Sequence, residues 1–373
     1  MNICNIQKGL AIGIILLFVG TGIIPAIAQN MEKLSLPTSR GIWLYVGGSG
    51  PGNYSKIQDA VDNSSDGDAV FVYNDSSPYY ENVVVDKSIN LIGEDRDTTV
   101  IRSDGFSIFS IIVDNVNVSG FKVVGSSNGI YIGSDNNIIS GNYFEFNWIG
   151  IKLWGASNNV ISNNIMQYID CDGILFSYDC NKNTILNNTI ECIFRSCIYL
   201  EGSTSGNVII NNVIKSATFG IYFTSLLFHS PSNNDIIGNY IQGAMRGIYL
   251  GGSFGGSVSD NIIIKNSVGI ELKSSRPDMI TGNYIIENNY QGIRITSHSR
   301  FNKITYNTFM NNTQHAFFSD CIYNIWDYNF WGRPRLLPYP IFGYLWYGKL
   351  LHVPWVNIDW HPAQEPYDIP GMR

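Results

Sequence analysis

The sequence predicts an all-β protein built as a parallel β-helix solenoid, with a helical cap at its N-terminal end and an aromatic cap at its C-terminal end. The main observation is a short pattern, Asn-x-apolar-x-x-Asn-x-apolar, that recurs from Asn137 to Asn329. The second Asn of each copy is residue 142, 164, 188, 212, 239, 261, 283, 307 or 329. A self-similar spacing of about two dozen residues is typical of one coil stacked on the next.

Two columns of the repeat are apolar in every copy. Three residues before the second Asn the chain has Ile139, Ile161, Ile185, Ile209, Ile236, Val258, Ile280, Ile304 and Trp326. Two residues after it the chain has Phe144, Met166, Ile190, Ile214, Ile241, Ile263, Ile285, Phe309 and Trp331. Columns without a polar member require the same inward direction in every coil, so we expect both to line the core.

A second unit, Gly-Ile-x-apolar, lies between most of the Asn pairs. Examples begin at Gly150, Gly220 and Gly247. The alternation of apolar and variable residues has the period of a strand with one buried face. Short β-branched runs separated by Gly and Asn do not suit helices, so each coil should contain two or three short strands.

A column of amides precedes the second Asn by five residues. Its members are Asn137, Asn159, Asn183, Asn207, Asn234, Asp278, Asn302 and Asn324, and Gly256 is the one break. Asn tolerates the left-handed backbone of a corner and bonds to nearby amides. Repeated at a corner, it can form a ladder of hydrogen bonds along the stack. We therefore interpret the Asn columns as structural rather than catalytic.

The composition argues against a nucleic-acid partner. The chain has 373 residues, a formal net charge of −7 and only 14% charged residues. Binding to phosphates would need a basic stripe, which this acidic chain does not provide.

The first residues have the form of a secretory signal peptide. Lys8 precedes an apolar run from Gly9 to Ile24, and Ala26-Ile27-Ala28 forms a small-x-small cleavage site. The sequence therefore predicts a secreted, extracellular or cell-surface protein that is not integral to the membrane after cleavage.

The chain divides into four predicted regions: signal peptide 1–28, N-terminal cap and irregular first coils 29–115, regular coils 116–332 and C-terminal cap 333–373. In the first cap, Ser55-Lys56-Ile57-Gln58 has the form of a capping box that opens a short helix. The C-terminal region is dense in Trp, Tyr and Phe and has no period. A cap is the simplest interpretation, and an aromatic docking surface is the alternative.

Five cysteines follow the signal peptide. They are Cys171, Cys180, Cys192, Cys197 and Cys321. An oxidising compartment would permit a bridge among the first four, which lie in neighbouring coils. Their positions within the coils differ, so the spacing leaves the pairing open.

The outward residue of the Gly-Ile-x-apolar unit suggests a carbohydrate-binding face. Tyr199, Tyr222 and Tyr249 should stack about 4.8 Å apart, and Phe318 is expected in the same column. Aromatic rings with a polar tip suit the faces of sugars. The alternative is that Tyr simply favours strands. The charged residues that could bond to sugar hydroxyls nearby are Glu201, Glu271 and Arg294.

Asp170, Asp172 and Arg195 form a candidate catalytic group. Stacking should place Arg195 over Cys171, between the two carboxylates. Such a group could perform acid/base work or hold Ca²⁺. The alternative is a surface salt bridge.

The residues alone argue against copper as a ligand. Soft metals need several Met, Cys or His side chains close together. The histidines occupy different coil positions, and no Met column forms; they are His229, His298, His315, His352 and His361.

Several stretches resemble a known superfamily. Tyr54–Val61, Tyr80–Val85 and Leu91–Gly93 resemble the opening of pectinesterase and pectate-lyase type β-helices. The repeats resemble carbohydrate-binding and sugar-hydrolysis (CASH) repeats, including those of NosD-like periplasmic copper-binding proteins. Trp326–Gly332 and Pro354–Trp360 resemble the end cap of prokaryotic, largely archaeal, surface members. The resemblance implies a single-stranded right-handed parallel β-helix of the pectin-lyase-like type.

The resemblance does not extend to catalytic motifs. Polygalacturonases carry Asn-Thr-Asp, Asp-Asp, Gly-His-Gly and Arg-Ile-Lys, and pectinesterases carry Gly-Asp-Phe-Ile-Phe-Gly. This sequence contains none of them. No catalytic residue of those families can therefore be carried over.

The sequence favours a surface protein that binds a polysaccharide or cell-surface glycan without catalysis, or that serves as a surface component. The first alternative is a polysaccharide lyase or glycoside hydrolase. The second is a NosD-like copper-binding accessory protein.

Overall fold

The structure is a computed structural model that describes residues 41–216, 218–226, 229–347 and 351–368. Residues 39–366 group into one compact unit, and the description concerns the described part of it. The predicted signal peptide, residues 1–28, lies outside the described residues. No helix in the described part of the chain has both the length and the apolar character needed to cross a bilayer.

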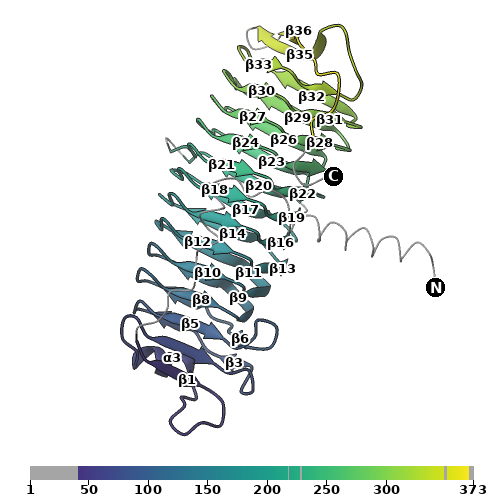
Figure 1. Ribbon diagram of the computed structural model, residues 1–373. Coiled ribbons are helices and arrows are strands. Elements are labelled where there is room, and N and C mark those ends of the chain that lie inside the picture. The colour runs from purple at the N-terminus through teal and green to yellow at the C-terminus, as the bar shows by residue number, and fades with distance from the viewer. Residues whose placement is uncertain (1–40, 217, 227–228, 348–350, 369–373) are drawn as a thin grey trace, which may run out of the picture. The chain divides into compact units, whose positions relative to one another are not determined.

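The unit is a parallel β-solenoid, as the repeat predicted (Figure 1). One strand from each coil joins a 13-stranded parallel sheet. In order of pairing its strands are β1 (Trp43–Val46), β2 (Ala69–Val72), β5 (Asn90–Gly93), β8 (Asn117–Ser119), β10 (Ile138–Ser140), β12 (Val160–Ser162), β15 (Thr184–Leu186), β18 (Val208–Ile210), β21 (Asp235–Ile237), β24 (Ser257–Ser259), β27 (Met279–Thr281), β30 (Lys303–Thr305) and β33 (Ile325–Asp327).

Two further strands complete most coils. The strand after the second Asn forms β13 (Ile165–Ile169), β16 (Thr189–Cys192), β19 (Val213–Ser216), β22 (Tyr240–Gln242), β25 (Ile262–Ile264), β28 (Tyr284–Ile286), β31 (Thr308–Met310) and β34 (Phe330–Trp331). The Gly-Ile-x-apolar unit forms β14 (Asp172–Ser177), β17 (Ser196–Glu201), β20 (Phe219–Thr224), β23 (Arg246–Gly251), β26 (Val268–Lys273), β29 (Gln291–Thr296) and β32 (Gln314–Ser319). In two early coils both merge into β9 (Lys122–Ile132) and β11 (Tyr143–Trp154). The first coils contribute β3 (Tyr79–Tyr80), β4 (Val83–Val85), β6 (Val100–Arg102) and β7 (Ser107–Ile111).

The two apolar columns lie in the core, which confirms the prediction from their purity. Ile139, Ile161 and Ile185 pair in register and are fully buried, and Phe144, Met166 and Ile190 form the second buried column. Side chains at equivalent positions of the repeat are therefore aligned along the stack of coils.

Asparagine ladders connect the coils, as the amide columns predicted. The backbone N–H of Asn188 donates to Oδ1 of Asn212 over 2.9 Å, and Nδ2 of Asn188 donates to the same atom over 3.0 Å. Nδ2 of Asn212 in turn reaches the Ile185 carbonyl over 3.0 Å. A third ladder, which the sequence analysis missed, runs through Asn266, Asn288 and Asn312.

A helix forms at the N-terminal end, but not with the predicted cap. Helix α3 spans Ile57–Asp62, its N-cap residue is Lys56, and no side chain of the cap bonds to it. The capping box opened by Ser55 is therefore wrong. Instead the carboxylate of Glu81, from the next coil, accepts the N–H groups of Ile57 and Gln58 over 2.9 and 3.0 Å. The role of the helix as a cover for the first coil remains a prediction.

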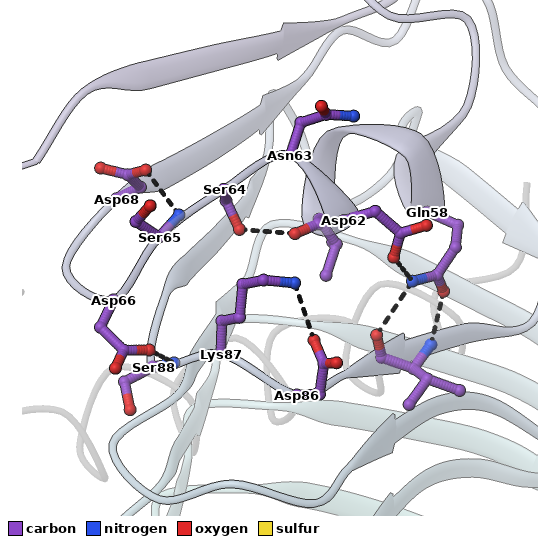
Figure 2. A network of polar contacts seen from close by, with 12 residues as sticks. Gln58, Asp62, Asn63, Ser64, Ser65, Asp66, Asp68, Asp86, Lys87 and Ser88 are labelled. Atoms are coloured by element: carbon purple, nitrogen blue, oxygen red, sulfur yellow. Dashed lines mark hydrogen bonds and ion pairs between the residues drawn. The ribbon is translucent and has the colours of Figure 1, made fainter.

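The side chain of Gln58 ties helix α3 to the second coil (Figure 2). Its Nε2 donates to Asp62 over 2.7 Å and to the Val84 carbonyl over 3.2 Å, and its Oε1 accepts the Val84 N–H over 2.8 Å. The side-chain amide of Gln58 thereby pairs with both backbone groups of Val84 in β4, as the backbone of a neighbouring strand would.

An antiparallel hairpin follows the last regular coil. It consists of β35 (Tyr339–Tyr347) and β36 (Leu351–Asp359), and β35 pairs in parallel with β32. The buried carboxylate of Asp359 accepts the backbone N–H of Asn329 over 3.0 Å and the indole N–H of Trp331 over 2.9 Å. The hairpin therefore ends the second Asn ladder.

The five cysteines of the described region are buried and unbridged. The predicted domain boundaries at residues 115 and 332 remain predictions.

Replacing a ladder amide should destabilise the fold strongly. Asn212→Ala removes the acceptor of two Asn188 donors in a dry corner, and each orphaned group costs about 1–3 kcal/mol. We expect a loss of roughly 3 kcal/mol or more in the free energy of unfolding, measured by urea titration. The exposed neighbour of another ladder, Asn289, provides the control, because Asn289→Ala should change little. Equal effects of the two variants would refute the structural role of the ladder.

Asp278 interrupts the first ladder. Its Oδ1 accepts from Gly256 N and from Ser253 Oγ, whereas its Oδ2 is buried without a partner. Burial raises the pKa of Asp278 to about 6, against the lowering effect of those bonds. In the following coil, Nδ2 of Asn302 donates to the Ser275 carbonyl, three residues before Asp278. If residue 278 were Asn, its Nδ2 could donate a hydrogen bond to the Ser253 carbonyl in the same way.

Asp278→Asn should therefore stabilise the protein in a pH-dependent manner. The folded pKa lies above the unfolded value, so Asp278 takes up a proton on folding and its contribution falls as pH rises from about 4 to about 6. We expect a gain of about 2–3 kcal/mol in urea unfolding at pH 8 and almost none at pH 4. The exposed Asp104→Asn is the control. A gain of the same size at both pH values would show that the buried charge of Asp278 is not the cause of the gain.

Candidate functional site

Two neighbouring columns of the Gly-Ile-x-apolar strands face outward. A Cβ on Gly173 would lie 2.5 Å from Cγ2 of Ile190, and one on Gly220 would lie 2.7 Å from Cγ2 of Ile241. The glycine therefore points inward, and the isoleucine that follows it is fully buried. The residue before the glycine and the residue after the isoleucine are left on the outside, which brings their side chains together on one surface.

Four aromatic rings gather on this surface, and we call them the tyrosine face: Tyr199, Phe219, Tyr222 and Tyr249. The three tyrosines pair in register across β17, β20 and β23. Tyr222 lies 4.8 Å from Tyr199 and 5.2 Å from Tyr249 between ring centroids. Phe219, from the other column, stacks on Tyr222 at 4.3 Å. The predicted tyrosine column thus exists, with one ring that the sequence analysis did not include.

The stacked rings cover one another's faces. Tyr222 has near-parallel rings against it, at 19° to Tyr199 and 17° to Phe219. Tyr199 contacts Tyr222 and also lies 4.4 Å beneath the Arg195 guanidinium, and only 5% of it is exposed. A sugar therefore cannot stack on the face of Tyr199, as the sequence analysis supposed, without displacing a neighbour. Phe219, Tyr222 and Tyr249 are half-buried and supply most of the exposed area of the tyrosine face.

Asp172 and Arg195 form a half-buried ion pair beside Tyr199. Nη1 of Arg195 lies 3.0 Å from Oδ2 of Asp172 and 3.9 Å from Sγ of Cys171. Asp172 is fully buried, while 43% of the Arg195 side chain is exposed. Desolvation raises the pKa of Asp172 to about 6, although the Arg195 charge opposes the shift. Asp172 therefore binds its proton more tightly than an exposed aspartate does.

A second charged group lies at the other end of the tyrosine face. The buried carboxylate of Glu271 is 2.5 Å from Nε of Arg246 and 3.7 Å from Nε of Arg294. The Arg246 guanidinium lies 5.6 Å from the Phe219 ring and 5.8 Å from the Tyr249 ring. Glu271 thereby holds Arg246 against the aromatic rings.

The hydroxyls of Tyr199 and Tyr249 are neutral donors at ordinary pH. Burial raises the pKa of Tyr249 to about 12, with a further contribution from Glu271. Burial also raises the pKa of Tyr199, and the Glu201 carboxylate adds to the shift. Neutral hydroxyls can both donate and accept hydrogen bonds, as sugar hydroxyls do.

The structure assembles only part of the predicted site. Asp172, Arg195 and the three tyrosines share one surface, and Glu271 with Arg294 borders it. Asp170 is not brought into an ion pair with Arg195, so the predicted pair of carboxylates is reduced to one. Phe318 was misplaced in the outward column: it is fully buried, and Phe317 pairs with Arg294 instead. In β32 His315 takes the position of the glycine and Ala316 that of the isoleucine, so the outward position falls on Phe317.

Phe219 and Arg246 were missed. Each stands directly before the glycine of its strand, at the position that Asp172 holds in β14. The predicted aromatic column included only the residue after the isoleucine. The glycine of each unit is the signal in the sequence that could have identified this second outward column, because the residue before an inward glycine faces outward.

The described residues contain no group of three or more His, Cys, Asp or Glu side chains that could hold a metal ion. Each histidine has another partner. His315 is buried beside Phe309 and Trp331, and burial lowers its pKa to about 4. His298 bonds to Asp320, and His361 bonds to Asp327. These residues do not fit a copper centre.

The stacked parallel coils define a protein of the parallel β-helix class. Within that class, the model of the family described as periplasmic copper-binding protein (NosD) matches residues 61–240 and 224–336. The chain therefore belongs to the NosD family.

Individual proteins are similar over smaller or more distant ranges. A cell surface glycoprotein of Methanothermus fervidus is 32% identical over 154 residues, a match that covers 32% of this chain and 26% of that protein. The DFA-IIIase of Arthrobacter chlorophenolicus A6 without its lid has a TM-score of 0.63 at 12% identity, over 79% of this chain and 95% of that one. The A-module of the mannuronan C-5 epimerase of Azotobacter vinelandii has a TM-score of 0.57 at 15% identity, over 72% and 90%. The two structures share the fold with this chain.

Arg195→Gln should cost more stability at high pH than at low pH. Asp172 has a raised folded pKa, so its contribution to stability declines as pH rises from about 4 to about 6, and loss of the Arg195 charge raises that pKa further. Because Arg195 is partly exposed, we expect an extra loss of only about 1 kcal/mol at pH 8 relative to pH 4.5. Urea unfolding at both pH values measures it. Lys265→Gln, at an exposed ion pair, should show no such difference; a pH-independent loss in Arg195→Gln would contradict the coupling.

Proposed function

We propose that this protein is a cell-surface β-helix protein that binds polysaccharide through the tyrosine face without acting on it chemically. The observation that carries the proposal is the continuity of the face. Four touching rings, three of which carry a hydroxyl, span three successive coils, with Arg195 at one end and the Arg246–Glu271–Arg294 group at the other. Strands in neighbouring coils are about 4.8 Å apart, so the groups recur regularly along one line. A chain of repeating sugar units would meet equivalent groups at each step.

Membership of the NosD family and the similarity to a cell surface glycoprotein support an extracellular or surface location. That relative is matched over about a quarter of its length, so its role is applied here as part of the proposal. The predicted signal peptide agrees with the same location.

The charges on the face favour binding over catalysis. Glycoside hydrolysis ordinarily uses two carboxyl groups that flank the scissile bond. Here the two buried carboxylates, Asp172 and Glu271, are each held by arginine. The arginines leave donors at the rim for hydroxyl or carboxylate groups of a glycan.

Removing the hydroxyls without disturbing the rings tests the proposal. The triple variant Tyr199→Phe, Tyr222→Phe, Tyr249→Phe keeps the stack, whereas alanine variants would open it. Each lost hydrogen bond is worth about 1 kcal/mol, so we expect at least a tenfold weaker binding to oligosaccharides that the wild-type protein retains. An array of neutral and uronic-acid oligosaccharides, followed by calorimetry, provides the measurement. The matched control is Tyr143→Phe, Tyr240→Phe, Tyr284→Phe, on outward positions of a different strand.

Three results would argue against the proposal. Wild-type protein that retains no glycan would remove its basis. New reducing ends or unsaturated products, lost in Arg195→Gln, would assign a hydrolase or lyase instead. Stoichiometric retention of copper by the purified protein would favour the activity in the family's description.

A further inference from the structure

Two leucines are presented to solvent at the C-terminal end. Leu336 is 96% exposed and Leu337 is 77% exposed, in the segment between β34 and β35. Single exposed apolar side chains are common on protein surfaces, but two adjacent leucines that are both this exposed point to an interaction site. Neither leucine packs in the core of the solenoid.

The hairpin that follows also carries exposed apolar side chains. Phe342 pairs directly with Val356, and Trp346 pairs with His352, so these side chains share one face of the hairpin. Phe342, Val356 and Trp346 are all exposed. The exposed Trp360 follows Asp359, which pairs with Tyr339 at the start of β35 and so lies at the same end of the hairpin as Leu337.

The charges within the segment that forms this surface are positive, and Glu365 lies beside it, next to Gln364, which bonds to the Arg335 carbonyl. Between Asp327 and Asp359 the sequence contains no Asp or Glu, although the whole chain carries a formal net charge of −7. Asp359 itself is buried beneath Asn329 and Trp331. Arg333 and Arg335 directly precede the two leucines, and Arg335 lies 4.6 Å over the Tyr339 ring. The apolar tip is thus bordered by cations on an otherwise acidic protein.

The chemistry of this surface fits a lipid bilayer better than a further protein strand. Trp and Tyr concentrate at the level of lipid headgroups, and Arg beside exposed Leu is typical of segments that bind membrane surfaces. Strand β36 contains Pro354, which has no N–H to offer an added strand. An anionic headgroup layer would neutralise the arginines while the acyl region accepts the leucines.

We propose that the C-terminal surface formed by Leu336, Leu337, Phe342, Trp346, Val356 and Trp360 binds peripherally to an anionic lipid surface. Leu336 and Leu337 enter the bilayer interface, and Arg333 and Arg335 contact the headgroups. The first coils, at the other end of the strand order, are then directed away from the lipid. The proposal is independent of glycan binding by the tyrosine face.

Vesicle sedimentation tests the proposal. Purified protein is mixed with vesicles of equal parts phosphatidylglycerol and phosphatidylcholine, or of phosphatidylcholine alone. We expect stronger binding to the anionic vesicles, a blue shift of Trp fluorescence on binding, and at least a tenfold lower partition coefficient for Leu336→Ser, Leu337→Ser. Arg333→Gln, Arg335→Gln should lose most of the preference for anionic vesicles and its dependence on salt.

The matched control is Phe106→Ser, Ile112→Ser, which removes two exposed apolar side chains from an early coil. All variants carry the same N-terminus, so a difference between them reports only the substituted positions, and thermal unfolding verifies the fold of each. Absence of vesicle binding by the wild type, or equal binding by the leucine variant, would overturn the proposal. Self-association that the leucine substitutions abolish, without vesicle binding, would assign the surface to a second copy of the chain and would also overturn it.

Discussion

The fold depends on one side-chain hydrogen bond repeated from coil to coil, in which a buried asparagine Oδ1 accepts the backbone N–H of the asparagine below it. Corners are where a solenoid leaves backbone groups without strand partners, and a buried group left unpaired is costly. The amide resolves this because one side chain both accepts and donates. The stacking that follows fixes the register of every strand, and the register places the outward residues of the tyrosine face in line.

Much of this architecture could be predicted from residue type and spacing. The apolar columns through Ile139 and Phe144 identified the core, and the amide columns identified the corners, because a structural position that recurs in every coil leaves a periodic trace. Features that occur once leave no such trace. Glu81 caps helix α3 from another coil, and His315 replaces the glycine of the unit in β32, so that Phe317 rather than Phe318 takes the outward position. Neither could be found by counting along the repeat.

The candidate site was partly predictable for the same reason. Tyr199, Tyr222 and Tyr249 occupy equal slots, so their alignment followed from the period. Phe219 and Arg246 belong to a second outward column that exists only because the glycine turns inward, and this depends on close backbone contact rather than on residue type. Ring orientation was also beyond the sequence: the covered faces of Tyr199 and Tyr222 change the kind of contact that the surface can offer. Asp170 showed the limit of stacking arguments, since a side chain near a corner need not turn toward its neighbour.

Asp359 gives the array a direction and an end. A carboxylate can receive the two donors of Asn329 but has no amide hydrogen to pass on, so the chain of donors stops there. Coils upstream each carry their own donor and acceptor and are interchangeable in this respect. Lengthening or shortening of the protein during evolution is therefore easiest by whole coils inserted or lost before the terminal carboxylate, whereas the hairpin that supplies it must stay last.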